Sequence, residues 1–181
     1  MAVVGVVGSG AGGVERLAEG LVEPLIARGH TVAVTLTPTA FTWLDSAGQV
    51  QKLEELTGLP VRAQSRLPHE KSPHPPPDVL VAAPATSNTV AKLALGIADN
   101  QALTVLCENI TVTPMVVFPR VNAAHARQPA WESHLAALRS CGVRLVYGED
   151  VWPLCEPRTA PPGRDLPWGA ILAEILGLVG A

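Results

Sequence analysis

The sequence predicts a doubly wound α/β fold, in which helices cover both faces of a parallel sheet. Short unbroken apolar runs, typical of buried strands, alternate with segments that have helical spacing. The run at residues 3–7 is followed by glycines, a helical stretch and a second β-branched run that ends at residue 36. Such a strand–helix–strand unit has a right-handed crossover and parallel strands.

The first elements follow directly from this alternation. Apolar positions from Val14 to Ile26 predict a helix that Gly29 ends, and residues 31–36 predict the second strand. A helical stretch at residues 41–56, divided at Gly48, leads to a short extended piece near Val61. The proline-rich residues 66–77 predict a loop.

The rest of the chain continues the pattern. Strands are predicted at residues 78–83, 102–107, 114–118 and 143–147, and helices at 88–97, 129–140 and 167–179. Six or so strands alternating with helices indicate a Rossmann-like sheet. The length of 181 residues suits one domain spanning residues 1–181.

Composition limits the environment and the partners. A net charge of −3 provides no basic field for nucleic acid or an anionic membrane, so neither is expected as a partner. No stretch approaches the roughly 18 uncharged residues of a membrane span, and the start resembles no signal peptide. The three cysteines, Cys107, Cys141 and Cys155, are widely spaced and predict neither a disulfide framework nor a metal site. We therefore expect a cytoplasmic protein.

Residues 8–13, read GSGAGG, match the glycine-rich dinucleotide fingerprint between a strand and a helix. Such a turn directs backbone N–H groups at a phosphate, although a tight turn without a ligand has the same glycines. A dinucleotide would also require a carboxylate at the tip of the second strand. That tip has Thr37 and Thr39 instead, and therefore favours the mononucleotide FMN over NAD.

Residues 84–89, read PATSNT, follow a buried strand and lead into a helix. One explanation is structural, because Ser87, Asn88 or Thr89 could cap the helix. The other is a ligand site, because open α/β sheets bind ligands beyond the carboxyl ends of their strands. Three consecutive polar residues at that position favour the ligand site.

The same segment resembles the P-A-S-A-N-T motif of the homo-oligomeric flavin-containing cysteine decarboxylases. This family includes phosphopantothenoylcysteine decarboxylase and the peptidyl-cysteine decarboxylases of lantibiotic-type peptide synthesis. Residues 95–100 resemble its G-I-A-D-N element, and residues 118–122 resemble the start of its P-x-M-N-x-x-M-W motif. Residues 36–41 resemble its flavin-contacting turn. The resemblance covers residues 3 to about 147.

This resemblance implies an FMN-dependent decarboxylase that acts on a small molecule or peptide containing a cysteine. It also implies a homo-oligomer, a trimer or a multiple of trimers. The flavin would take a hydride equivalent from the cysteine Cβ, and the resulting thioaldehyde would accept the electrons released as carbon dioxide leaves, giving an enethiol. The resemblance assigns cofactor binding to Gly8, Ser9, Gly10, Thr37, Thr39, Phe41, Pro84, Ala85, Thr86, Ser87, Asn88, Thr89, Asp99 and Asn100.

The catalytic residues implied by the family are His69, as a base, and Asn122, which would orient the substrate carboxylate. The family spacing places its histidine one residue from His69, and His74 is the alternative in a path expected to face solvent. The second motif keeps Asn122, but His125-Ala126 replaces Met-Trp. Cys155 lies near the position of a proton-donating cysteine of the phosphopantothenoylcysteine branch, or is a small buried residue.

Two further functions agree with these departures from the family pattern. One is a flavoprotein of a secondary-metabolite pathway with other redox chemistry. The other is a non-catalytic, flavin-binding regulatory subunit, in which the flavin elements persist without the catalytic ones.

Overall fold

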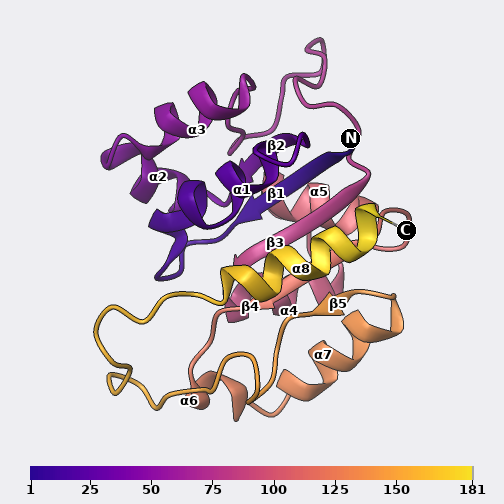
Figure 1. The fold of residues 1–181 in the computed structure, drawn as a ribbon. Helices are drawn as coiled ribbons and strands as arrows, with labels where there is room; N and C mark the ends of the chain where they lie inside the picture. Colours follow the sequence, from indigo (N-terminus) through magenta and orange to yellow (C-terminus); the bar gives the residue numbers. More distant parts are fainter. Residues whose placement is uncertain (181) are drawn as a thin grey trace.

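A five-stranded parallel sheet forms the centre of the computed structural model, which describes residues 1–180 (Figure 1). The strands are β1 (Val3–Gly8), β2 (Thr31–Leu36), β3 (Val79–Ala85), β4 (Met115–Pro119) and β5 (Arg144–Leu145), in the order β2-β1-β3-β4-β5. The predicted Rossmann-like α/β fold is confirmed. The strand order changes direction between β1 and β3, which is the point where open α/β sheets bind their ligands.

Helices and short helical turns connect the strands. They are η1 (Val14–Arg16), η2 (Ala18–Val22), α1 (Glu23–Ile26), α2 (Pro38–Ser46), α3 (Gln49–Thr57), α4 (Ser87–Leu95), α5 (Gln101–Asn109), α6 (Ala123–Ala126), α7 (Trp131–Ser140) and α8 (Trp168–Val179). The predicted division at Gly48 is confirmed, because Gly48 has a φ of 68° and separates α2 from α3. The helix predicted at residues 14–26 is irregular, since a 3-10 turn and a π-helical turn precede α1.

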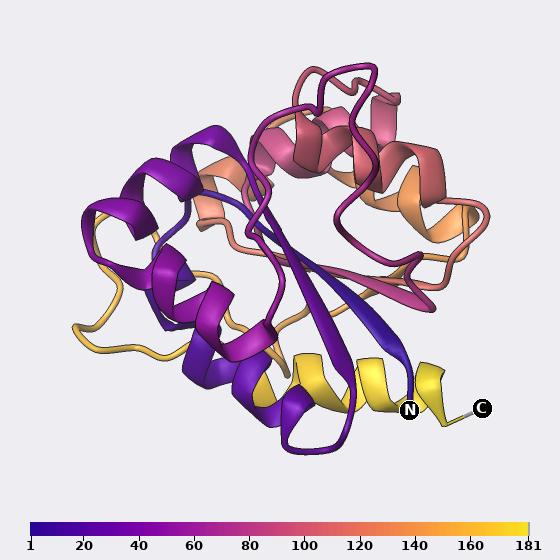
Figure 2. The same cartoon turned by 90° about the horizontal axis from the view of Figure 1, so that it is seen from above.

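Side chains alternate between two apolar layers on the two faces of the sheet. In β3, Val79 and Val81 enter the layer beneath η2, α1 and α8, whereas Leu80 and Ala82 enter the layer beneath α4, α5 and α7. Figure 2 shows α8 in yellow on one side of the strands and the pink and orange helices on the other. Because both faces are covered, the strands are continuous apolar runs.

Residues 102–107 form part of α5, and the strand predicted there is wrong. The side chain of Asn100 accepts a hydrogen bond from the backbone N–H of Leu103 at 3.1 Å and so caps the helix. Ala102, Leu103 and Leu106 are all buried on the inner face of α5, which is a helical spacing. The sheet therefore has five strands, not six, and β5 is shorter than residues 143–147.

The last helix, α8, packs on the sheet face formed by β3 and β4 and crosses the front of the molecule in Figure 1. At its first residue, Trp168 lies against Gly20 of the π-helical turn. A Cβ atom on Gly20 would lie 2.4 Å from Trp168 Cδ2, so only glycine permits this contact. No helix within residues 1–180 is long and apolar enough to cross a membrane.

Candidate functional site

The loops that follow β1, β2 and β3 meet at the carboxyl edge of the sheet, and backbone hydrogen bonds hold them together. The N–H of Ser9 donates to the carbonyl of Pro84 at 2.9 Å, which joins the first loop to the end of β3. The N–H of Thr37 donates to the carbonyl of Gly8 at 2.9 Å, which joins the second loop to the end of β1. Three segments predicted from the sequence are therefore neighbours in space.

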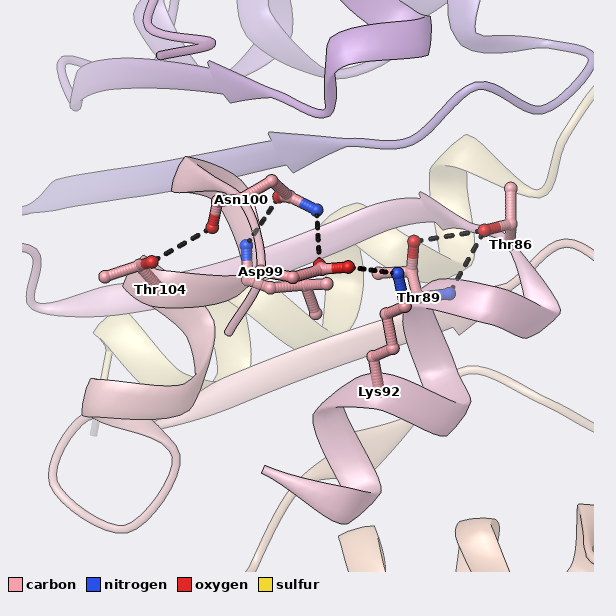
Figure 3. A network of polar contacts seen from close by, with 7 residues as sticks. Thr86, Thr89, Lys92, Asp99, Asn100 and Thr104 are labelled. Atoms are coloured by element: carbon pink, nitrogen blue, oxygen red, sulfur yellow. Dashed lines mark hydrogen bonds and ion pairs between the residues drawn. The ribbon is translucent and has the colours of Figure 1, made fainter. Parts of the chain in front are cut away.

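A buried cluster of three hydroxyl groups lies where these loops meet. Thr89 Oγ1 lies 2.9 Å from Ser9 Oγ. It also lies 3.0 Å from Thr86 Oγ1, which accepts from the N–H of Thr89 (Figure 3). Ser9 and Thr89 are 1% and 2% exposed. Thr86 caps α4, so the cap is none of the three residues, Ser87, Asn88 and Thr89, that the alternative structural explanation considered.

Backbone N–H groups are free beside this hydroxyl cluster. Those of Gly10 and Gly12 have no acceptor within residues 1–180. A Cβ atom on Gly10 would lie 2.6 Å from Thr39 Cγ2, so glycine is required where the loop passes the start of α2. Free N–H groups with neighbouring hydroxyls are donors of the kind that a phosphate requires, so this edge fits the phosphate of a mononucleotide.

Asp99 and Asn100 build the turn between α4 and α5 (Figure 3). Lys92 Nζ lies 2.5 Å from Asp99 Oδ2, and Asn100 Nδ2 donates to Asp99 Oδ1 at 3.1 Å. The bond from Lys92 is the main reason that the pKa of Asp99 is lowered. The backbone carbonyl of Asn100 accepts from Thr104 Oγ1 at 3.0 Å. These contacts fix the first turn of α5.

Two cavities that share Arg62, Ser65 and Arg66 lie along the loop after α3, one against α5 and the other against α2. Gln101 and Thr104 of α5 line a cavity of about 450 Å³ together with residues 65–68. Phe41 lines a second cavity of about 610 Å³, and Arg62 lines both. Burial, and then the neighbouring charge of Arg66, lower the pKa of Arg62. Cavities of about 300–1,000 Å³ are the usual size of small-molecule sites.

The two candidate histidines have surroundings opposite to those expected. His69 is exposed and makes no side-chain hydrogen bond within residues 1–180; it lies in a turn closed by the N–H of Glu70 and the carbonyl of Leu67 at 3.0 Å. His74 is half-buried, and its Nε2 lies 2.7 Å from the carbonyl oxygen of Pro60. The expectation that His74 faces solvent is therefore wrong. Burial is the main cause that lowers the pKa of His74.

Asn88 lies apart from the hydroxyl cluster. It is exposed, and with His125, Trp131 and His134 it lines a separate cavity of about 250 Å³. The structure thus brings Asn88 together with the histidine that replaces part of the second family motif. Ser87 lines the same cavity.

Asn122 lines another cavity, of about 160 Å³, with Cys155 and a group of arginines. Its Oδ1 accepts from the N–H of His125 at 2.9 Å and so caps α6, whereas its Nδ2 has no acceptor within residues 1–180. Cys155 is half-buried, and Arg164 Nη1 donates to its Sγ at 3.1 Å. The thiol therefore lines a cavity and is not simply a buried apolar group.

Sequence reasoning missed Arg164 and Trp152, which line this same cavity. They belong to residues 148–167, a stretch without regular structure that no periodic pattern connects to Asn122. Arg127 pairs with Glu156 beside this cavity, through Nη1–Oε1 at 2.6 Å and Nη2–Oε2 at 3.0 Å.

Comparison with known proteins finds a matching family and several similar proteins. The model of the family described as Flavoprotein matches residues 2–180. The Arabidopsis thaliana phosphopantothenoylcysteine decarboxylase is 35% identical over 69 residues, which are 38% of this chain and 33% of that protein. The coenzyme A biosynthesis bifunctional protein CoaBC of Thermococcus kodakarensis is 27% identical over 92 residues, which are 51% of this chain and 22% of that protein. The chain thus matches about a third or less of the length of these relatives.

Solved structures match over nearly the whole chain. The FMN-dependent cysteine decarboxylase TvaF from thioviridamide biosynthesis has a TM-score of 0.73 at 24% identity, covering 100% of this chain and 99% of that one. The FMN-dependent cysteine decarboxylase SpaF has a TM-score of 0.69 at 25% identity, covering 99% of this chain and 98% of that one. The cypemycin decarboxylase CypD has a TM-score of 0.70 at 22% identity, covering 99% and 96%.

Proposed function

The chain belongs to the Flavoprotein family, and we propose that it binds FMN and catalyses the oxidative decarboxylation of a cysteine-containing substrate. Its similarity to SpaF, which is described as an FMN-dependent cysteine decarboxylase, supports this reaction. So do the shorter matches to phosphopantothenoylcysteine decarboxylase. The substrate is a small molecule or a peptide with a cysteine, and residues 1–181 act as one domain.

One observation carries the proposal for the cofactor: free N–H groups and buried hydroxyls meet at the switch point between β1 and β3. The N–H groups of Gly10 and Gly12 and the hydroxyls of Ser9 and Thr86 supply hydrogen-bond donors for the FMN phosphate. The two cavities along the loop after α3, one lined by Phe41 and the other by Gln101 and Thr104 of α5, have the size for the flavin ring system.

The chemistry divides between the cofactor and the chain. When bound, the flavin supplies the two-electron oxidation of the substrate cysteine, after which loss of carbon dioxide is easy. Asn122 orients the substrate carboxylate, because its Oδ1 is held by the N–H of His125 and its Nδ2 remains free to donate. His69 moves the proton, since imidazole is the side chain that most often serves as a general acid or base.

We also propose that the protein is a cytoplasmic homo-oligomer, a trimer or a multiple of trimers, without nucleic-acid or membrane partners. Within residues 1–180, seven large apolar side chains are exposed, namely Met1, Trp43, Leu67, Leu95, Ile97, Val112 and Val151. Contacts between copies would cover such side chains. In an oligomer, His69 would reach the flavin across a subunit contact, which agrees with its exposure in one chain.

Anaerobic flavin reduction tests the proposal. The purified protein should be yellow and release FMN on denaturation, and a peptide that ends in cysteine should bleach the visible flavin absorbance while carbon dioxide is released. A peptide ending in serine is the matched control, because it has no thiol to oxidise. A colourless protein that takes up no FMN would refute the cofactor assignment.

The exposure of His69 favours a second candidate, a non-catalytic flavin-binding regulatory subunit. A protein that binds FMN but is reduced by neither cysteine peptides nor phosphopantothenoylcysteine would support it. Flavin reduction without release of carbon dioxide would instead indicate a secondary-metabolite flavoprotein with other redox chemistry.

A further inference from the structure

Two arginine side chains lie against one buried tryptophan in the cavity that contains Asn122. The guanidinium carbon of Arg164 lies 3.6 Å from the centre of the Trp152 ring, and that of Arg120 lies 5.3 Å from it. Trp152 is itself fixed by an edge-on contact with Phe118, with ring centres 5.8 Å apart. The tryptophan thus holds two cations at the carboxyl end of β4.

Glu15 is near enough for its charge to act on Arg120, but no carboxylate within residues 1–180 forms an ion pair with either arginine. The carboxylate of Glu156 lines the same cavity, but Arg127 binds both of its oxygens. Asp165, the neighbour of Arg164 in the chain, pairs with Arg16.

The surroundings of Arg120 favour an anionic ligand. Its Nε is buried and has no hydrogen-bond partner within residues 1–180. Burial, and then the nearby charge of Arg164, lower the pKa of Arg120. A buried, unpaired donor on a desolvated cation is an unfavourable arrangement that an oxyanion in the cavity would relieve.

We propose that Arg120 and Arg164 form an anion subsite beside Asn122 that holds a phosphate or carboxylate group of the substrate, distinct from the carboxylate that is lost. The cavity of about 160 Å³ is below the usual size of pockets for whole small molecules, about 300–1,000 Å³, and suits one such group. The planar guanidinium groups suit bidentate binding of either oxyanion. The identity of the ligand as part of the substrate rests on the proposed function.

The leaving carboxylate is the wrong partner for two cations. It loses its charge during decarboxylation, so ion pairs to it would stabilise the ground state more than the transition state and slow the reaction. A remote anionic group keeps its charge throughout, and its binding energy can position the reacting cysteine. The neutral amide of Asn122 is the better group for the carboxylate that leaves.

Titration with free anions tests the subsite without relying on catalysis. Inorganic phosphate and succinate are titrated separately into the purified protein at low salt, in an isothermal calorimeter. Saturable binding of either probe should weaken by about tenfold or more in Arg120→Gln and in Arg164→Gln, whereas Arg139→Gln, an exposed arginine on α7, should bind as the wild type does. If Arg164→Gln does not fold, Arg164→Lys keeps the charge without the planar contact and should still weaken binding. Equal binding by all variants, or no saturable binding, would overturn the subsite.

Two further measurements identify the source of the anion. Affinities of the apoprotein for FMN and riboflavin should be unchanged in Arg120→Gln, because the subsite serves the substrate. A loss of FMN affinity with riboflavin affinity retained would assign the arginines to the cofactor phosphate and refute the proposal.

The second measurement compares substrates with and without the anionic group, namely phosphopantothenoylcysteine with its dephosphorylated analogue, or cysteine peptides that carry Glu with peptides that carry Gln. In Arg120→Gln, only the KM for the anionic substrate should rise. If no substrate is decarboxylated, the proposed function fails, and the anion titration alone then decides the subsite.

Discussion

Thr89→Val is the sharpest test of the hydroxyl cluster, because valine has nearly the shape of threonine and removes only the hydroxyl. Thr89 Oγ1 makes hydrogen bonds to Ser9 at 2.9 Å and Thr86 at 3.0 Å. The buried Ser9 hydroxyl has no other partner within residues 1–180, whereas Thr86 Oγ1 keeps its bond from the N–H of residue 89 at 3.2 Å. The lost bond to Thr86, about 1 kcal/mol, and the buried Ser9 hydroxyl left without a partner, about 1–3 kcal/mol, predict destabilisation by about 2–4 kcal/mol.

A double-mutant cycle with Ser9→Ala separates this cluster from general packing. Ser9→Ala alone should cost about 1 kcal/mol, because Thr89 keeps its bond to Thr86. In that background Thr89→Val should also cost only about 1 kcal/mol, since no buried hydroxyl is left unpaired. Urea unfolding of the apoprotein, followed by circular dichroism, measures the four free energies. If the two substitutions change the free energy of unfolding additively within about 0.5 kcal/mol, the Ser9 and Thr89 hydroxyls are not coupled and the reasoning is refuted.

Other predictions concern the α5 cap and the two histidines. Asn100→Ala should lower the free energy of unfolding by about 1 kcal/mol through the lost helix cap, and Asn100→Ser, which keeps a capping oxygen without placing a second carboxylate beside Asp99, should restore most of it in thermal unfolding. His69→Asn should abolish decarboxylation while FMN binding and the melting temperature stay unchanged, and His74→Asn should leave turnover intact; a reversed result would assign the base to His74. Burial lowers the pKa of His74, so the unfolded chain takes up this proton at higher pH than the folded chain, and stability should fall as the pH drops through about 6.5. Urea unfolding at pH 7.5 and 5.5 should show a smaller fall in His74→Gln than in the wild type.

The strands and the turns at their carboxyl ends could be predicted because their signals are local. Residues 31–36 form a strand with the predicted bounds, since burial on both faces requires an unbroken apolar run. Residues 102–107 also form a short apolar run, but periodicity alone does not separate a short buried strand from a short buried helix. The deciding signal was Asn100, a residue typical of helix caps, directly before that run.

The candidate site likewise has a part with local sequence signals, which could be predicted, and a part without them, which could not. The family resemblance assigned Ser9, Thr86 and Thr89 to cofactor binding, and their segments were expected at the carboxyl ends of strands, which meet at one edge of a parallel sheet. The contact between Arg164 and Trp152 depends on the path of an irregular loop, for which the sequence has no periodic pattern. The surroundings of His69 and His74 likewise depend on how the proline-rich loop folds back over the sheet, where His74 meets Pro60.

The contact between Trp168 of α8 and Gly20 can form only after most of the chain has been synthesised. During synthesis on the ribosome, β3 and β4 emerge long before residues 168–179, so the apolar face that α8 covers stays open until those residues have emerged. Val81 and Phe118 then lie on a surface that nascent chains or chaperones can bind. A growing chain can therefore pair its strands early, but it closes this side of its core only when Trp168 reaches Gly20.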